Sequence, residues 1–272
     1  MLFRSLVAAF AASGGSPGLA VGNAIGSNIT NIALVLGCTA VVAPMVVHSS
    51  ILKREYPLLF FATLLVTVCM AVDNYLGWVD ALIFASTLLL IMFWLIHQAM
   101  SNRNTDPLID DFEHEIPSNM PMKKALWLLV LGIIILMLSS RLLVLGAVNI
   151  ATELGVSDLI IGLTIVAIGT SLPELAASVA SALKGHTDIA LGNVVGSNIF
   201  NIAAVMAVPG LLAPIALESV VFWRDYGMTL GLTLLLAALA LYQRPPKISR
   251  FEGGLLLAAY AGYLALLYNM NS

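Results

Sequence analysis

The sequence predicts an all-α polytopic membrane protein built from two inverted repeats, on the basis of three observations. Hydrophobic residues make up 60% of the 272 residues and charged residues only 10%, a balance far from that of a soluble globular domain. Eight apolar runs reach about the 20 residues that a helix needs to cross the hydrocarbon core. Two of these runs repeat one motif, GNAIGSNITNI and GNVVGSNIFNI.

The eight predicted spans follow one another through polar or Pro/Gly-containing connections. A β-barrel would need alternating segments of about 10 residues instead, and the sequence shows none. The spans cover residues 18–44, 56–73, 79–99, 124–147, 157–183, 188–214, 222–242 and 251–269.

The internal repeat sets the orientation of the two halves. Aligning residue n with residue n + 170 matches 18–44 with 188–214 without a gap. Five potential spans would make up each half in its complete form. Two like halves with an odd number of spans must be upside down relative to each other, which is the inverted-repeat plan of many secondary transporters.

These observations divide the chain into a first, incomplete membrane repeat (1–99), an acidic linker (100–123) and a second membrane repeat (124–272). If the linker is cytoplasmic, the loops on its side collect most Lys and Arg residues and the outside loops keep only Arg224, as the positive-inside rule requires. The linker lacks the spacing and the glycine of an EF-hand, so we expect a solvated connector.

A proline and a glutamate interrupt the apolar run IVAIGTSLPELAAS at residues 165–178. Pro173 lacks an N–H, so the helix should kink or break and leave the carbonyl of Gly169 without its intrahelical partner. Thr170 and Ser171 add hydroxyl groups, and Glu174 lies one turn after Thr170 on the same face. The pattern predicts a cluster of oxygens with one carboxylate, a set that suits Ca²⁺ or Na⁺.

The twin motifs predict the other wall of this cluster. Their glycines permit close backbone approach, and polar side chains repeated at mid-membrane depth are costly, which favours a functional interpretation over simple helix packing. The polar residues are Asn23, Ser27 and Asn28 in the first motif and Asn193, Ser197 and Asn198 in the second.

The segments IGLTIVAIGTSLPELAASVAS and DIALGNVVGSNIFNI resemble the second α-repeat of the sodium/calcium exchanger family, in the cation/calcium antiporter superfamily. GNAIGSNITNI resembles the latter half of the first α-repeat. The resemblance covers most of the chain. It implies a ten-helix antiporter that binds Ca²⁺ and Na⁺ in alternation, in a bacterial inner (plasma) membrane, with no cofactor. Three points stay open: whether the coupling ion is Na⁺ or H⁺, whether K⁺ is co-transported, and the oligomeric state.

The resemblance also assigns roles to residues. Glu174 would be the main cation carboxylate, Thr170 and Ser171 would contribute backbone or hydroxyl oxygens, and Asn28 and Asn198 would be the central amide ligands. The weaker candidates are Ser27, Ser197, Asn23 and Asn193.

The first repeat departs from the family pattern because its counterpart of GTSLPE is absent, and Met1 to Arg4 stand against Ser171 to Glu174. By the offset of 170, Arg4 stands opposite Glu174, where the first repeat would have its own glutamate. Two glutamates would neutralise one divalent ion. An arginine would instead pair with Glu174 and repel the ion.

Residues 125–170 have no counterpart ahead of Met1, which corresponds to one helix and half of another. We therefore expect an amino-truncated form of a complete antiporter. The alternative is a true short protein, either an inactive remnant or one completed by assembly.

Other classes of function fit less well. An intramembrane hydrolase using Ser171 would lack a base, because the four histidines fall at span ends or in loops. A cation channel would share the polar midplane, but inverted repeats favour alternating access. No nucleotide-binding or nucleic-acid-binding motif occurs. Cys38 and Cys69 lie in apolar runs, which predicts buried thiols and no disulfide.

Overall fold

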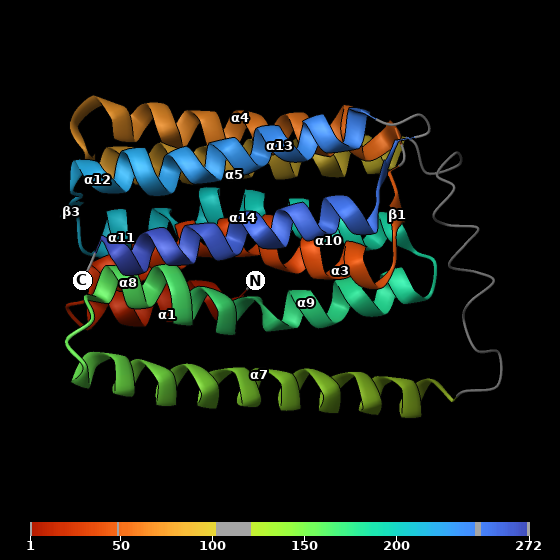
Figure 1. The fold of residues 1–272 in the computed structure, drawn as a ribbon, viewed down its shortest axis with the longest axis horizontal. Coiled ribbons are helices and arrows are strands. Elements are labelled where there is room, and N and C mark those ends of the chain that lie inside the picture. Colours follow the sequence, from red (N-terminus) through yellow and green to blue (C-terminus); the bar gives the residue numbers. More distant parts are fainter. Residues whose placement is uncertain (1, 48, 102–120, 243–245, 271–272) are drawn as a thin grey trace.

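The computed structural model describes residues 2–47, 49–101, 121–242 and 246–270, so most of the predicted acidic linker lies outside the described residues. Helices dominate and run side by side as one bundle (Figure 1). Up to residue 101 the elements are α1 (Leu2–Ser13), α2 (Pro17–Ile29), the π-helical segment η1 (Thr30–Leu36), α3 (Gly37–Val42), β1 (Met45–Val46), α4 (Ser49–Asp73), β2 (Tyr75–Leu76) and α5 (Trp78–Ser101).

The second half consists of α7 (Met122–Glu153), α8 (Asp158–Ile161), η2 (Gly162–Val166), α9 (Ala167–Leu183), α10 (Thr187–Phe200), η3 (Asn201–Val205), α11 (Ala207–Leu212), β3 (Ile215–Ala216), α12 (Ser219–Val221), η4 (Phe222–Tyr226), α13 (Gly227–Tyr242), β4 (Lys247–Ile248) and α14 (Arg250–Asn269). From α9 onward this half repeats the order of the first, with α12, η4 and α13 in place of the single helix α4, and these elements are preceded by α7, α8 and η2.

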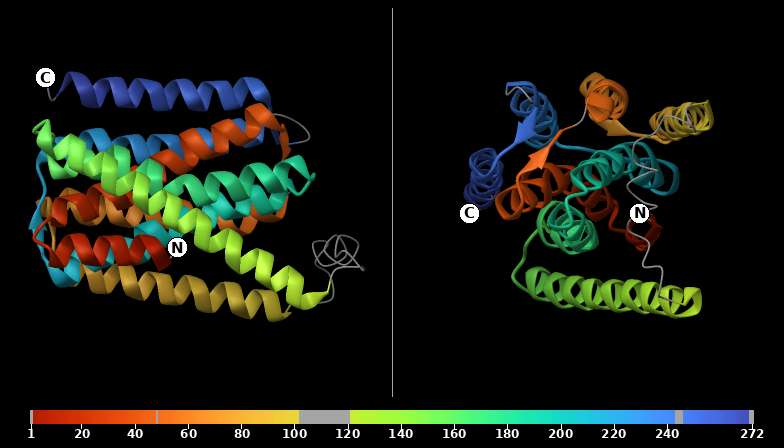
Figure 2. Two further views of the ribbon diagram at one scale, coloured as in Figure 1. Left: turned by 90° about the horizontal axis from the view of Figure 1, so that it is seen from below. Right: turned by 90° about the vertical axis from the view of Figure 1, so that its right-hand side faces the viewer.

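Seven helical stretches of the described residues are long and apolar enough to cross a membrane, and each overlaps a predicted span, which confirms the polytopic all-helical class. The remaining predicted span, 124–147, lies inside α7 at the edge of the bundle (Figures 1 and 2). The seven are Pro17–Val42, Arg54–Asp73, Trp78–Gln98, Asp158–Leu183, Thr187–Leu212, Ser219–Tyr242 and Arg250–Asn269.

The two halves interrupt their central helices at equivalent residues. The stretch from Pro17 to Val42 and the stretch from Thr187 to Leu212 begin and end 170 residues apart, and each contains one π-helical segment. Each follows a glycine in the left-handed region, Gly15 with φ 90° and Gly185 with φ 91°. A residue with a Cβ is strained in that region, so glycine permits the sharp entry into both helices.

Two short antiparallel ribbons join the halves, since β1 pairs with β4 and β2 with β3. The offset of 170 makes β1 and β3 equivalent. In Figure 1 these two strands lie at opposite ends of the bundle. Equivalent elements at opposite ends are what an inverted repeat requires, so the predicted inversion is present.

Helix α2 contacts the backbone of η2 and the preceding turn without intervening side chains. A Cβ on Gly26 would lie 2.4 Å from the carbonyl oxygen of Leu163, and one on Gly162 would lie 2.5 Å from that of Leu19. No side chain fits at either position, so glycine is required. This approach brings the first twin motif against the segment that carries Glu174.

Of the kink or break predicted at Pro173, the break does not occur, because α9 runs from Ala167 through Pro173 to Leu183. The irregular part is η2, which ends seven residues earlier at Val166. A proline removes a single N–H donor, and a membrane helix continues when side chains satisfy the carbonyls of that turn. Gly169 has a partner, and the carbonyl of Thr170 accepts from Arg4.

Two further predictions concern residues away from the centre. Arg224 does not lie in an outside loop, because it belongs to η4 within the span Ser219–Tyr242 and binds Asp225 there at 2.8 Å. Its charge is tolerated because it is paired at once with the neighbouring carboxylate. Cys38 and Cys69 are free, as predicted, but they are partly rather than fully buried.

Candidate functional site

Four helical stretches bring their polar residues together in the interior of the bundle. They are α1, α2 with η1, η2 with α9, and α10 with η3. Each π-helical segment adds a wider turn next to this place, and π turns often mark functional sites because they redirect side chains and backbone carbonyls. The buried polar residues here are Arg4, Asn23, Ser27, Asn28, Asn31, Thr170, Ser171, Glu174, Ser197, Asn198 and Asn201.

Arg4 and Glu174 form a buried ion pair at the centre. Nη2 of Arg4 lies 3.0 Å from Oε2 of Glu174, and the two side chains are 1% and 8% exposed. The pairing predicted from the repeat alignment is therefore present. A charge at this depth needs an opposite charge or several hydrogen bonds, and each of the two residues neutralises the other.

The guanidinium of Arg4 also donates hydrogen bonds to three acceptors. Nη2 donates to the carbonyl of Thr170 at 3.0 Å and to Oγ of Ser171 at 2.9 Å. Nη1 donates to Oδ1 of Asn201 at 3.0 Å. Both hydrogens of Nη2 are thus directed at other oxygens. This explains why Oε2 of Glu174 has an ionic contact with Arg4 but accepts no hydrogen bond from the described residues.

Two amide pairs connect the repeats symmetrically. Nδ2 of Asn201 donates to Oδ1 of Asn28 at 3.1 Å, and Nδ2 of Asn31 donates to Oδ1 of Asn198 at 2.9 Å. The two bonds exchange places under the offset of 170, because 28 and 31 correspond to 198 and 201. Amide groups paired in this way satisfy polar atoms that would be costly in an apolar bundle.

A third group of contacts joins the first motif to the Thr170 turn. Oγ1 of Thr170 donates to Oδ1 of Asn23 at 3.0 Å, and Oγ of Ser27 donates to the same oxygen at 3.3 Å. Asn193, the equivalent of Asn23, is only partly buried. It belongs to α10, and its Nδ2 donates to Oγ of Ser178 at 2.9 Å and to the carbonyl of Glu174 at 3.2 Å, both on α9.

Several buried polar atoms at this centre have no hydrogen-bond partner among the described residues. The oxygens are Oε2 of Glu174, Oγ of Ser197 and Oδ1 of Asn31, and the nitrogen is Nδ2 of Asn23. Unsatisfied buried polar atoms are uncommon and need an explanation such as a water or an ion. In the described part of the chain no three His, Cys, Asp or Glu side chains gather as a metal cluster. The oxygens available here are therefore mainly neutral.

The structure gathers almost all of the residues predicted for the site and adds Asn31 and Asn201. These two follow Asn28 and Asn198 by three residues inside the motifs GSNITNI and GSNIFNI. Their presence in both copies of the repeat was the signal available in the sequence. The π-helical turn that directs Asn201 toward Arg4 could not be read from spacing.

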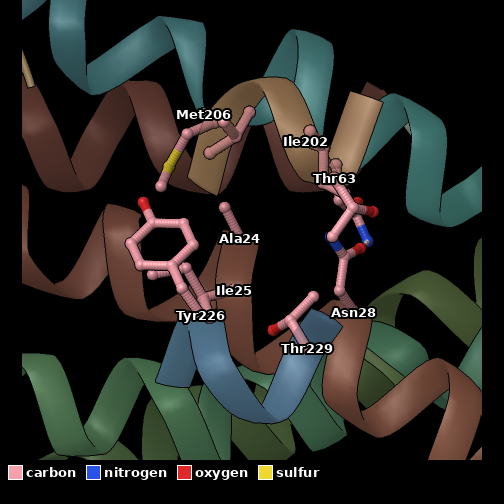
Figure 3. A pocket seen from close by; sticks show the side chains of 10 residues that line it. Ala24, Ile25, Asn28, Thr63, Ile202, Met206, Tyr226 and Thr229 are labelled. Atoms are coloured by element: carbon pink, nitrogen blue, oxygen red, sulfur yellow. Dashed lines mark hydrogen bonds between the residues drawn. The ribbon is translucent and has the colours of Figure 1, made fainter. Parts of the chain in front are cut away.

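A small cavity of about 10 Å³ adjoins the amide pair Asn28–Asn201. Figure 3 shows Asn28 and Thr63 on one side of it and Tyr226 with Met206 on the other. The hydroxyl of Tyr226 has no hydrogen-bond partner among the described residues. The cavity therefore lies between the amide pair and Tyr226, and residues of both repeats line it.

The fold and this centre define a membrane transport protein of the inverted-repeat type. The family model described as "Sodium/calcium exchanger protein" matches residues 5–97 and 124–269. The chain belongs to that family, which is a family of transporters, and the resemblance noted from the repeat motifs is confirmed.

Relatives and solved structures agree with this membership. A protein of Alkalimonas amylolytica with the provisional name antiporter CaxA is 45% identical over 97% of this chain and 83% of its own length. The inner membrane protein YrbG of Escherichia coli (strain K12) is 38% identical over 92% of this chain and 77% of its own length. A solved structure of the sodium-calcium exchanger NCX_Mj is 34% identical and has a TM-score of 0.74, with 97% of this chain and 82% of that one covered.

Proposed function

We propose that the chain exchanges Ca²⁺ for Na⁺ across the membrane by alternating access at the polar centre between its repeats. The observation that carries the proposal is the buried set of oxygens from both repeats around one carboxylate, Glu174. Hard cations take such mixed carboxylate, carbonyl, hydroxyl and amide oxygens. Family membership supports the choice of ions, because the relative MaX1 of Methanosarcina acetivorans carries the name sodium/calcium exchanger.

The ligand roles follow from position. Glu174 supplies the negative charge, Thr170 and Ser171 supply oxygens from the same turn, and the amides of the twin motifs supply neutral oxygens from both halves. Asn28 and Asn198 with Asn31 and Asn201 lie where the two repeats meet. Bound Na⁺ or Ca²⁺ takes the place of the Arg4 guanidinium as the counter-charge of Glu174, so the carboxylate stays neutralised while the site moves between its two open faces.

Location and orientation extend the proposal. The relative YrbG is named as an inner membrane protein, and we place this chain in the same kind of membrane. The excess of Lys and Arg on one side places the 100–123 linker in the cytoplasm.

Reconstitution into liposomes tests the proposed exchange. Purified protein in sodium-loaded vesicles should take up radioactive calcium when the outside sodium is removed, and the uptake should stop when the gradient is collapsed. Glu174→Gln should lower the uptake by about tenfold or more, since the carboxylate drives cation binding. Glu218→Gln, which changes an exposed carboxylate at the start of α12, is the control and should leave the uptake unchanged.

Two results would contradict the proposal. Full uptake by the Glu174→Gln variant would remove the carboxylate from its assigned role. Calcium entry that continues without any sodium gradient would indicate a cation channel and not an exchanger.

A further inference from the structure

Arg4 is the most deeply buried charge in the polar centre. Its side chain is 1% exposed and contacts residues of two separate stretches, α9 and η3. Residue 4 lies one position before the range matched by the family model, which starts at residue 5. The contact between Arg4 and Glu174 is thus a property of this chain that family membership does not supply.

We propose that Arg4 is a specificity-determining residue that competes with the divalent cation for Glu174 and thereby sets the Ca²⁺ affinity of the site. The inference rests on the proposed exchange function. Its ligand class is a divalent cation, and its competitor is the guanidinium of the same chain.

The geometry supports competition because Arg4 holds the oxygens that a divalent ion would need. The acceptors are Oε2 of Glu174, the carbonyl of Thr170, Oγ of Ser171 and Oδ1 of Asn201, all between 2.9 and 3.0 Å from Nη1 or Nη2. Ca²⁺ takes six to eight oxygens at close range. It cannot use these four while the guanidinium occupies them.

Charge adds to this steric conflict. A guanidinium is protonated at all physiological pH values, so proton release cannot relieve the competition. Coulomb repulsion between a unit positive charge and a divalent ion a few ångströms away is strong in a low-dielectric interior. A monovalent ion is repelled half as strongly at the same distance, so Arg4 lowers the affinity for Ca²⁺ more than that for Na⁺.

Equilibrium binding of radioactive calcium to the purified full chain tests the proposal, with Arg4→Gln and Arg4→Lys compared with the unchanged protein. Arg4→Gln should bind Ca²⁺ at least about tenfold more tightly, because Glu174 loses its internal partner. Arg4→Lys should remain within about threefold of the unchanged protein, because the positive charge persists. Arg224→Gln is the matched control, since it removes a partly buried arginine that pairs with the carboxylate of Asp225, and it should leave the affinity unchanged.

The outcomes separate this inference from the proposed function. Equal affinity of Arg4→Gln and the unchanged protein would overturn the inference, and sodium-driven uptake by the unchanged protein would leave the exchange function standing. Tighter binding by Arg4→Gln without any sodium-driven uptake would support the inference and contradict exchange. An equal gain in Arg4→Gln and Arg4→Lys would overturn the inference, because position and not charge would then control affinity.

A second variant protects the test against misfolding. Arg4→Gln leaves Glu174 without a counter-charge, so this variant should be purified in Ca²⁺, which replaces the missing cation. Arg4→Met keeps a similar length without polar hydrogens and should show the same gain in affinity. Added Ca²⁺ should raise the Tm of both variants more than that of the unchanged protein, and a smaller rise in both variants would overturn the inference.

Discussion

The two repeats have the same backbone plan and different chemistry at their meeting point. Their central helices begin at Pro17 and Thr187 and end at Val42 and Leu212, 170 residues apart at both ends. The amide pairs between them are symmetric as well. Residues 4 and 174 are also equivalent under this offset, but one is an arginine and the other a glutamate, and they pair with each other. The symmetric helices and amide pairs thus hold the two repeats together, while the pair Arg4–Glu174 determines which ion the site between them can bind.

Two smaller differences distinguish the halves away from the charges. A Cβ on Gly26 would meet the Leu163 carbonyl, but one on its equivalent Gly196 would meet nothing within 4 Å. Tyr56 donates its hydroxyl to the carbonyl of Thr233 at 2.7 Å, whereas the buried hydroxyl of its equivalent Tyr226 has no partner among the described residues. The same substitution can therefore be made at both members of each pair, and its effects on stability can be compared directly.

The largest effect is expected from making the charged pair symmetric with Arg4→Glu. Two buried carboxylates without a counter-ion repel each other, so the calcium-free variant should lose about 3 to 5 kcal/mol of stability. Ca²⁺ should restore that stability, because one divalent ion neutralises both groups. Thermal unfolding in detergent with and without Ca²⁺ measures this, and a Tm that ignores Ca²⁺ would show that the two carboxylates do not share an ion.

The next effect concerns the glycine positions. Gly26→Ala forces a methyl group against the backbone of η2 and should cost about 1 to 3 kcal/mol. Gly196→Ala meets no neighbour and should leave stability unchanged or raise it by up to about 1 kcal/mol, because alanine favours helix. Comparison of the two melting curves is the measurement. Equal losses in both variants would contradict the close approach of α2 and η2.

The two amide pairs should also differ in how much stability is lost when one asparagine of each pair is replaced. Asn201→Ala removes the hydrogen bonds that Asn201 makes to Nη1 of Arg4 and to Oδ1 of Asn28, so it should cost about 2 to 3 kcal/mol. Asn31→Ala removes a single bond to Asn198 and should cost about 1 kcal/mol. The order of the two Tm values tests the additional contact with Arg4, and a more damaging Asn31→Ala would contradict it.

The smallest effect is expected at the tyrosines. Tyr56→Phe loses one hydrogen bond and should cost about 1 kcal/mol. Tyr226→Phe removes a buried hydroxyl without a partner and should be neutral or slightly stabilising. The same melting experiment decides between them. A larger loss in Tyr226→Phe would reveal a partner for its hydroxyl in another state of the protein.

Most of the membrane-spanning helices and their two-repeat arrangement could be predicted from the sequence, because the length of apolar runs and internal repetition can be read directly from the order of residues. The seven membrane-length stretches of the described residues each overlap a predicted span. The repeat offset also placed Arg4 opposite Glu174. What spacing could not predict was the geometry inside the helices. It suggested a kink or break at Pro173, whereas the irregularity is η2, and it did not assign Asn201 to the site.

The sequence by itself determined the membrane class, the inverted repeat and the residue types at the centre, since composition and periodicity depend only on the order of residues. Tertiary structure alone decided which oxygens Arg4 binds, that Asn201 takes part, and that Asn193 donates to Ser178. The physical reason is that hydrogen-bond partners depend on how helices from different parts of the chain approach. Here that approach is set by glycines, whose missing side chains let α2 contact the backbone of η2.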